Sequence, residues 1–211
     1  MKNQSPPTPT RQCECLARVT TMKIFTPDEC TDIINNGLNR WDVQKSMILE
    51  NTNFVEDLDY RNTTMFVPLE PPVELLKKIG QSIMPFNFSA DGYGFEAVGM
   101  AEPPVMMRYL APDIHPKGKP GKYGWHMDIG SEPVSSMRKL SFSIFLNSGE
   151  YEGGELEFHT GKTVEPDRAQ NSSNFIGSAF VFPSYLVHRV LEVTKGIRYT
   201  LVGWVHGNSF Q

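Results

Sequence analysis

A histidine and an aspartate lie two residues apart in the segment YGWHMDIG, which spans residues 123–130 and contains His126 and Asp128. Side chains two residues apart on a β-strand point to the same face, so a strand here would present both groups together. Two histidines and one carboxylate form a facial site for non-haem Fe(II) that leaves coordination positions open. The pair is therefore either two thirds of such a metal site or a histidine that happens to lie near a carboxylate.

The third ligand of such a site would be a histidine from a distant strand. Among the histidines of the chain, only His188, in the segment FPSYLVHRV, follows an apolar strand and a turn. A single histidine in such a segment is more often a packed or solvated residue than a ligand, so both interpretations stay open. The remaining histidines have no partner at ligand spacing, and we expect them at the surface: His115, His159 and His206.

An arginine follows in the last strand candidate, KGIRYTLVGWVHG. Strand alternation places four side chains of this segment on one face: Arg198, Thr200, Val202 and Trp204. If that face is interior, the guanidinium needs an anionic partner, and the strand contains no acidic residue. A ligand carboxylate bound by the guanidinium fork would satisfy it. The alternative is an exposed face with a solvated arginine.

Short strands and turns fill the chain from Pro104 onward. Their pattern indicates a closed barrel or a double-sheet jelly roll. The long loop LAPDIHPKGKPGKYG interrupts the series between the first two strands. The predicted strands are PVMMRYL (104–110), YGWHMDI (123–129), KLSFSIFLN (139–147), ELEF (155–158), GSAFVFP (177–183), HRVLEV (188–193) and RYTLVGWVHG (198–207).

The front of the chain is predicted to be largely helical. In TPDEC, Thr26 is placed as an N-cap, Pro27 at the first helical position and Glu29 to close a capping box. Gly37 is expected to mark the end of this helix. A second helix is predicted in PPVELLKKIGQSIM (71–84), after a strand in RNTTMFVPL (61–69).

Length and composition suit one domain, predicted over residues 15–211, preceded by a disordered tail over residues 1–14. The net charge of −4 gives no general attraction to nucleic acid or to an anionic membrane, so neither is an expected partner. We find neither a signal-peptide core nor an apolar run of about 18 residues. The three cysteines, Cys13, Cys15 and Cys30, fit neither a disulfide framework nor a zinc site, so we expect free thiols in a reducing, cytoplasmic compartment.

The chain resembles the Fe(II)/2-oxoglutarate-dependent dioxygenases, and among them the prolyl 4-hydroxylase-like and PKHD-type hydroxylases. The resemblance covers about half of the chain, roughly residues 104–207. It implies an all-β core with flanking helices (α+β), a double-stranded β-helix or jelly roll with the N-terminal helices packed on one sheet. The segments that carry it, in order, are MRYLAP, YGWHMD, RKLSFSIFLN, YEGGELEF, GSAFVFPSYLVHRVLEV and KGIRYTLVGWV.

The resemblance also implies roles for single residues. The catalytic iron ligands would be His126, Asp128 and His188. Arg198 would bind the distal carboxylate of 2-oxoglutarate. Around the same pocket it implies Tyr109, Thr200 and Trp204, with Tyr123 facing the substrate. Two positions depart from parts of the family: Phe145 replaces a tyrosine of some relatives, and animal collagen prolyl hydroxylases carry lysine where Arg198 stands.

The implied reaction hydroxylates an unactivated C–H bond with O2 while 2-oxoglutarate becomes succinate and CO2, with ascorbate as a candidate auxiliary. The presence of Asp128 favours hydroxylation over halogenation. We predict a prolyl residue of a protein or peptide as the substrate. A free amino acid or other small molecule is the first alternative, and a non-catalytic metal- or oxoglutarate-binding sensor is the second. Nucleobase repair is disfavoured because no arginine follows shortly after Arg198.

The loop over residues 111–122 leads directly into the strand of His126. It is longer than an ordinary barrel turn, and we predict a lid over the pocket. Its basic side chains, Lys117, Lys119 and Lys122, would favour an acidic partner. The alternative is a passive solvated loop. The sequence gives no prediction of oligomeric state.

Overall fold

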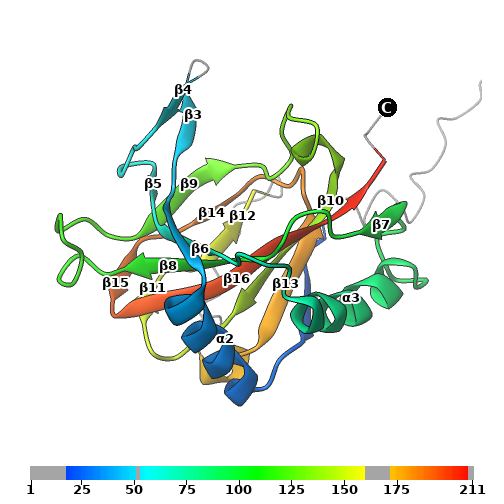
Figure 1. Ribbon diagram of the computed structural model, residues 1–211, viewed down its shortest axis with the longest axis horizontal. Coiled ribbons are helices and arrows are strands. Elements are labelled where there is room, and N and C mark those ends of the chain that lie inside the picture. Colours follow the sequence, from blue (N-terminus) through cyan, green and yellow to red (C-terminus); the bar gives the residue numbers. More distant parts are fainter. Residues whose placement is uncertain (1–17, 51–52, 160–171, 209–211) are drawn as a thin grey trace, which may run out of the picture.

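Two facing antiparallel sheets form the body of the protein, and a computed structural model describes them over residues 18–50, 53–159 and 172–208. The larger sheet has the strand order β1-β13-β10-β16-β8-β6-β2, with β7 paired to β16 (Figure 1). Its strands are β1 (Thr20–Lys23), β2 (Asp42–Lys45), β6 (Thr64–Val67), β7 (Ala97–Gly99), β8 (Val105–Leu110), β10 (Arg138–Phe145), β13 (Ser178–Pro183) and β16 (Ile197–Gly207).

The smaller sheet has the order β12-β14-β9-β5. Its strands are β5 (Arg61–Asn62), β9 (Lys122–His126), β12 (Leu156–Phe158) and β14 (His188–Val190). Two further pairs are β11 (Glu152–Gly153) with β15 (Val193–Lys195), and β3 (Ile48–Glu50) with β4 (Asn53–Val55). The hairpin of β3 and β4 projects from the body of the molecule (Figure 1).

The helices α2 (Pro27–Arg40) and α3 (Val73–Asn87) pack on one face of the larger sheet. Alternate residues of β10 reach this outer core, where Phe142 meets Ile33 of α2 and Ile79 of α3 in one apolar cluster. A second cluster, which includes Phe145 and Phe182, fills the space between the two sheets. Two short 3₁₀ helices cover Ser135–Met137 and Ser173–Phe175. The predicted jelly roll with N-terminal helices on one sheet is confirmed.

The capping box at the start of α2 is confirmed. The Thr26 hydroxyl accepts a hydrogen bond from the Glu29 N–H at 3.3 Å, and the Glu29 carboxylate accepts one from the Thr26 N–H at 2.8 Å. The predicted end of this helix is wrong, because Gly37 lies inside it and the helix continues to Arg40. A Cβ at Gly37 would come within 2.4 Å of the Met106 methyl group, so this glycine permits close helix-to-sheet packing.

The second helix is confirmed but runs beyond residue 84 to Asn87, with Pro85 inside it. The buried Asn87 side chain fixes the chain after the helix, since its amide donates to the Phe95 carbonyl and its oxygen accepts from the Phe95 N–H. Sequence analysis missed β1 and β2. Both lie at the edges of the larger sheet, and all four residues of β2 are exposed. Backbone pairing with distant strands forms them without an apolar pattern of their own.

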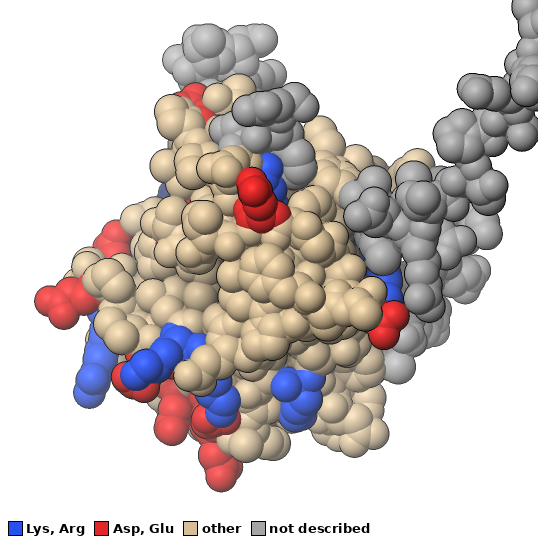
Figure 2. Space-filling view, turned by 90° about the vertical axis from the view of Figure 1, so that its right-hand side faces the viewer, with Lys and Arg blue, Asp and Glu red and all other residues tan. Residues whose placement is uncertain are grey.

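Several predictions concern residues outside the described ranges, namely the disordered tail over residues 1–14 and the thiols of Cys13 and Cys15. Cys30 is a buried free thiol, and burial raises its pKa to about 11. Within the described ranges, no helix has the length and apolar character needed to cross a membrane. On the face drawn in Figure 2, acidic and basic side chains lie next to one another rather than in separate patches.

The cap of α2 yields a stability prediction. Thr26→Ala removes the acceptor of the capping box and should lower the free energy of unfolding by about 1 kcal/mol. Urea unfolding followed by circular dichroism measures this loss. Thr31→Ala is the control, because the Thr31 hydroxyl bonds only to the Pro27 carbonyl within the helix and alanine has the higher helix propensity. Equal losses in both variants would contradict a capping role for Thr26.

Candidate active site

Two histidines of the smaller sheet face each other across a strand pair. His126 ends β9 and His188 begins β14, and the two are register partners. The Asp128 carboxylate lies between them, with one oxygen 3.7 Å from Nε2 of His126 and the other 3.7 Å from Nε2 of His188. The candidate ligand atoms of the three residues all lie within 4.8 Å of one another. The residues that could hold a metal ion are therefore clustered as the spacing indicated.

The prediction that Asp128 shares a strand face with His126 is wrong. The strand ends at His126, and Asp128 follows it in an irregular segment rather than on the same strand face. Two backbone hydrogen bonds hold this segment, because the N–H groups of Asp128 and Ile129 both donate to the Ser184 carbonyl, at 2.9 and 3.2 Å. A contact with the turn before β14, rather than strand alternation, thus brings the carboxylate to the histidines.

Both imidazoles are oriented by backbone carbonyls. Nδ1 of His126 lies 2.8 Å from the Gly124 oxygen, and Nδ1 of His188 lies 2.8 Å from the Leu186 oxygen. A proton on each Nδ1 satisfies these contacts and leaves Nε2 free to bind a metal. Burial, together with the neighbouring His188, lowers the pKa of His126 to about 4, so its ring is neutral at pH 7. Burial alone would raise the pKa of Asp128, but the two histidines lower it overall.

A cavity of about 340 Å³ adjoins this cluster between the two sheets. Its wall contains all the site residues that the family resemblance implied. They are Tyr109, Tyr123, His126, Asp128, His188, Arg198, Thr200 and Trp204.

The Arg198 guanidinium is buried inside the barrel, with only 1% of the residue exposed. The solvated alternative is therefore excluded. Its Nη1 lies 3.4 Å from the Thr200 hydroxyl, and its Cζ lies 5.0 Å from the centre of the Tyr109 ring. Nε and Nη2 have no hydrogen-bond partner among the described residues. Buried charged donors without an acceptor are costly, so this site is built for an anion that enters the cavity.

Two neighbours shape the space around this guanidinium. Gly154, with φ of +70°, passes so close that a Cβ there would lie 2.8 Å from Cδ of Arg198. The second glycine of YEGGELEF thus makes room for the arginine in addition to forming a turn. Phe145 is fully buried, and its ring packs edge-on against Phe180, with the centroids 5.2 Å apart. Cζ of Arg198 lies 5.6 Å from the centre of the Phe145 ring, so the guanidinium has an apolar neighbour where some relatives of the resembled family carry a tyrosine.

Comparison with known proteins agrees with this geometry. Residues 108–206 match the model of the 2OG-Fe(II) oxygenase superfamily. Over this segment, slightly less than half of the chain, the protein is similar to that superfamily. The superfamily is named for Fe(II) and 2-oxoglutarate, and the matched segment contains a histidine–carboxylate cluster and a buried guanidinium with two nitrogens unpartnered among the described residues.

Curated relatives cover the same part of the chain. A PKHD-type hydroxylase of Hyphomonas neptunium is 35% identical over 103 residues, which are 47% of this chain and 44% of that protein. A PKHD-type hydroxylase of Prochlorococcus marinus is 38% identical over 88 residues, or 41% of this chain and 37% of that protein. The chain thus matches less than half the length of these two relatives.

Solved structures of low sequence identity share the fold over most of the chain. A Pseudomonas putida prolyl-4-hydroxylase has a TM-score of 0.61 at 16% identity, covering 90% of this chain and 93% of its own. A viral collagen prolyl hydroxylase from Paramecium Bursaria Chlorella virus-1, solved with 2OG, has a TM-score of 0.60 at 18% identity, covering 92% and 99%. A Trichoplax adhaerens prolyl hydroxylase was solved in complex with a hypoxia inducible factor oxygen degradation domain peptide fragment. It has a TM-score of 0.61 at 13% identity, covering 92% of this chain and 86% of its own.

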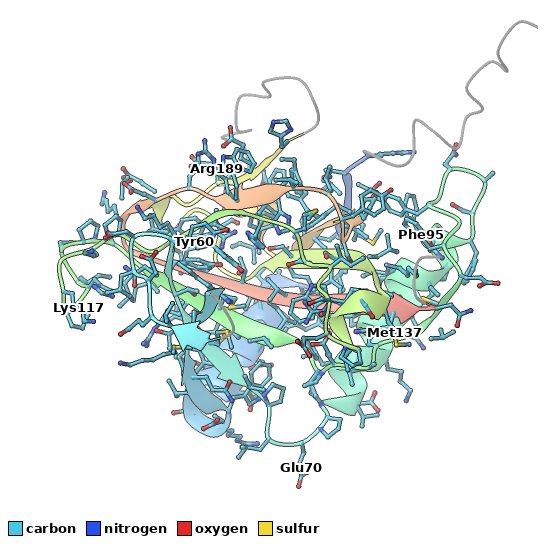
Figure 3. The ribbon with its side chains drawn as sticks, turned by 90° about the horizontal axis from the view of Figure 1, so that it is seen from above. Tyr60, Glu70, Phe95, Lys117, Met137 and Arg189 are labelled. Atoms are coloured by element: carbon cyan, nitrogen blue, oxygen red, sulfur yellow. The ribbon has the colours of Figure 1, made fainter. Side chains whose placement is uncertain are left out.

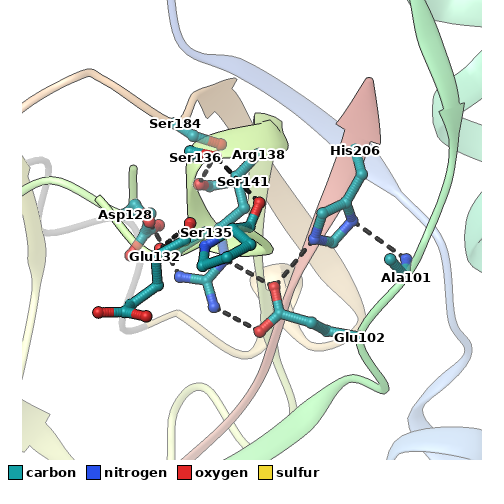
Figure 4. Close-up of polar contacts among 11 residues, drawn as sticks. Ala101, Glu102, Asp128, Glu132, Ser135, Ser136, Arg138, Ser141, Ser184 and His206 are labelled. Atoms are coloured by element: carbon teal, nitrogen blue, oxygen red, sulfur yellow. Dashed lines mark hydrogen bonds and ion pairs between the residues drawn. The ribbon is translucent and has the colours of Figure 1, made fainter. Parts of the chain in front are cut away.

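Sequence analysis missed a network of charged side chains beside Asp128 of the His–Asp–His cluster (Figure 4). Arg138 makes two hydrogen bonds to the Glu102 carboxylate, at 2.7 and 2.6 Å, and a third to the Asp128 carbonyl at 2.9 Å. Its guanidinium also lies 3.5 Å from the centre of the Trp204 ring. Glu102 lies in an irregular segment just before the predicted strand PVMMRYL, and no sequence pattern pointed to it.

The prediction that His206 lies at the surface is wrong, because only 1% of it is exposed. Its Nδ1 accepts a hydrogen bond from the Ala101 N–H at 3.1 Å, and its Nε2 lies 2.9 Å from the Glu102 carboxylate (Figure 4). The prediction rested on the lack of a partner at ligand spacing and overlooked that His206 continues the face of β16 that carries Arg198 and Trp204. The loop before β8 covers that side and buries the ring. His159 is exposed as predicted, whereas His115 is half-buried.

The ring of Tyr123 stacks on that of His126, with centroids 3.6 Å apart and planes 14° apart. The Arg61 guanidinium lies over the same tyrosine ring, 4.4 Å from its centre. Tyr60 meets Tyr123 edge-on, and its hydroxyl donates to the Trp125 carbonyl. Neither Tyr60 nor Arg61 was singled out from the sequence, although Arg61 begins the predicted strand over residues 61–69, because no local pattern marked a role for either side chain.

The loop over residues 111–122 extends to one end of the molecule, where Figure 3 labels Lys117. Each of its lysines is paired with a carboxylate of the protein itself: Lys117 with Glu56 at 3.6 Å, Lys119 with Asp59 at 2.6 Å and Lys122 with Glu192 at 2.9 Å. The Asn62 amide also donates to the carbonyls of Lys119 and Pro120. These contacts engage the positive charges that were expected to attract an acidic partner.

The Glu102 network predicts acid sensitivity. Burial alone would raise the pKa of Glu102, but hydrogen bonds from His206 and Arg138 lower it to about 2. A lowered pKa means that the ionised carboxylate stabilises the fold above about pH 4.5, and that this contribution is lost as the pH falls toward 2. Glu102→Gln should therefore cost roughly 1–3 kcal/mol at pH 7 and progressively less below pH 4.

Urea unfolding at a series of pH values measures this difference. Glu132→Gln, which changes an exposed carboxylate nearby, serves as the control and should have little effect at any pH. A destabilisation by Glu102→Gln that stays constant from pH 7 to pH 3 would show that the ionised network does not support the fold.

Proposed function

We propose that the protein is an Fe(II)- and 2-oxoglutarate-dependent dioxygenase that hydroxylates an unactivated C–H bond and releases succinate and CO2. One observation carries the proposal: a single cavity joins the His–Asp–His cluster to a buried guanidinium that lacks an acceptor among the described residues. A metal site alone would not need that guanidinium, and an anion site alone would not need the cluster.

The metal would be held by His126, Asp128 and His188. Two imidazole nitrogens and one carboxylate oxygen are a donor set suited to Fe(II), and three ligands leave positions for other molecules. The carbonyls that fix each Nδ1 keep both Nε2 atoms directed at the metal position. When bound, the iron supplies the activation of O2 that no side chain of the protein can perform.

Arg198 would hold the distal carboxylate of 2-oxoglutarate through its two unpartnered nitrogens. The Thr200 hydroxyl lies beside the guanidinium and would donate to the same carboxylate. Tyr109 and Trp204 would line the pocket, and Tyr123 would separate the metal cluster from the substrate side. The apolar walls would exclude water, which strengthens each electrostatic contact within the cavity.

For the substrate, we propose a prolyl residue of a protein or peptide. The support is similarity to PKHD-type hydroxylases, together with a fold shared with prolyl hydroxylases, one of them solved with a peptide. A free amino acid or another small molecule remains the alternative for the same chemistry. A mass gain of one oxygen on a prolyl peptide, but not on free proline, would separate the two. Metal-dependent succinate release separates either from a non-catalytic sensor.

The metal cluster predicts a response to divalent cations. Saturating Mn(II), at about a hundred times its dissociation constant, should stabilise the fold by about 2.7 kcal/mol. In a domain of this size that raises the melting temperature by roughly 5–10 °C. His188→Ala should abolish most of the rise in a thermal melt, whereas His159→Ala, which alters an exposed histidine, should retain it. An unchanged metal response in His188→Ala would exclude this residue as a ligand.

The guanidinium predicts a loss of co-substrate affinity. Arg198→Ala should weaken the binding of 2-oxoglutarate to the Mn(II)-loaded protein at least tenfold, since truncating one partner of a buried charge pair costs about 2–5 kcal/mol. Isothermal titration calorimetry measures the affinity. Arg189→Ala is the matched control, because Arg189 is paired with Glu157 and does not line the cavity. Wild-type affinity in Arg198→Ala would place the co-substrate elsewhere.

A further inference from the structure

The charges that line the cavity do not cancel. Among the described residues its wall contains five ionised side chains: Arg61, Glu102, Asp128, Arg138 and Arg198. Three guanidiniums therefore face two carboxylates. The two imidazoles count as neutral, since a histidine must be unprotonated to bind a metal. A divalent metal ion and the dianion of 2-oxoglutarate compensate each other, so the loaded cavity still carries one excess positive charge.

Arg61 is the guanidinium left without an anion. Arg138 is neutralised by its double hydrogen bond to Glu102, and Arg198 is assigned to 2-oxoglutarate under the proposed function, on which this inference rests. Among the described residues, the terminal nitrogens of Arg61 reach only the Met47 carbonyl and the Met65 sulfur, each at 3.3 Å. Its Nε is buried without a hydrogen-bond partner among the described residues. A sheltered cation with only weak, neutral acceptors is costly unless an anion joins it.

The position of Arg61 suits contact with the substrate. Arg61 belongs to the smaller sheet, where it is the register partner of Tyr123, whereas Arg198 projects from the larger sheet. The tyrosine ring touches both the Arg61 guanidinium and the His126 imidazole, so one aromatic ring separates this cation from a candidate metal ligand. A group bound by Arg61 would lie beside the reaction centre and apart from the anion on Arg198.

The short strand that carries Arg61 is held firmly in place. The buried Asn62 donates to two carbonyls of the neighbouring loop, and the Tyr60 hydroxyl donates to the Trp125 carbonyl. Gly124 allows the Tyr60 ring to approach closely, because a Cβ there would lie 2.6 Å from it. A recognition side chain on such a fixed support loses little freedom when it binds.

We propose that Arg61 binds a carboxylate of the substrate and thereby selects anionic substrates. The planar guanidinium matches a carboxylate in a two-pronged contact, and Tyr123 supports its face. The carboxylate comes from the α-carboxyl group of a free amino acid or a peptide C-terminus, or from an acidic side chain next to the hydroxylated residue. These sources share one chemistry at Arg61.

The test compares acids with their neutral amides. The whole 211-residue chain, loaded with Mn(II) and saturating 2-oxoglutarate so that Arg198 is occupied, is titrated at constant ionic strength with acetate, acetamide, N-acetyl-L-proline and N-acetyl-L-prolinamide. Thermal shift and calorimetry report binding without turnover. We expect saturable binding of the acids, with N-acetyl-L-proline at least tenfold tighter than its amide. Free L-proline and an N-acetyl-Asp-Pro-amide peptide then distinguish the sources of the carboxylate.

Three variants decide the assignment. Arg61→Gln should remove the preference for acids while the affinities for Mn(II) and 2-oxoglutarate stay within twofold of wild type, and Arg61→Lys should restore part of it. Arg108→Gln is the matched control, because Arg108 also has a buried, unpartnered Nε but does not line the cavity. The Arg108→Gln variant should prefer acids over their amides to the same degree as the wild-type protein.

Two outcomes overturn the inference: no saturable binding of any acid to the loaded wild-type protein, or an acid preference that survives Arg61→Gln. Both leave the proposed function intact as long as Mn(II) and 2-oxoglutarate bind. A failure of 2-oxoglutarate to bind the Mn(II)-loaded protein instead contradicts the proposed function and, with it, the charge balance that singles out Arg61.

Discussion

The direct pairing of His126 with His188 across β9 and β14 is the constraint on which the candidate active site depends. Strand side chains alternate between faces, so a slip of one residue in this register would turn one imidazole away from the other. The neighbouring strand β12 supports the register from the other side, where Phe158 is the partner of His188. The turn before β14 then places Asp128 through the Ser184 carbonyl, so one strand pair and its turn assemble the cluster.

Charge compensation between the sheets explains most of the remaining polar contacts. Glu102 satisfies both Arg138 and His206, and Arg138 in turn holds the backbone of Asp128. That network is complete within the protein. The guanidinium of Arg198 and the Nε of Arg61 are not satisfied by the described residues, and the cavity lies between them. Incomplete compensation at these two positions is what marks the cavity as a binding site.

The segment that matches the superfamily and the front half of the chain contribute different residues to this site. The segment that matches the oxygenase superfamily, residues 108–206, contains the cluster and the buried Arg198. The charged cavity residues outside that segment are Glu102 and Arg61. The residues of the proposed metal and co-substrate sites thus lie in the matched core, while residues from the less similar front half complete the wall.

The sequence by itself determined the local elements and the chemistry of the matched core. The capping box at Thr26, the alternation that puts Arg198 and Thr200 on one strand face and the metal-binding residue types could all be read from neighbouring residues, because such signals act over a few positions. The tertiary structure alone decided the C-terminal end of α2, the edge strands β1 and β2, the position of Asp128 and the burial of Arg198 and His206. Each of these depends on a contact with a segment far away in the chain, and local periodicity contains no information about that contact.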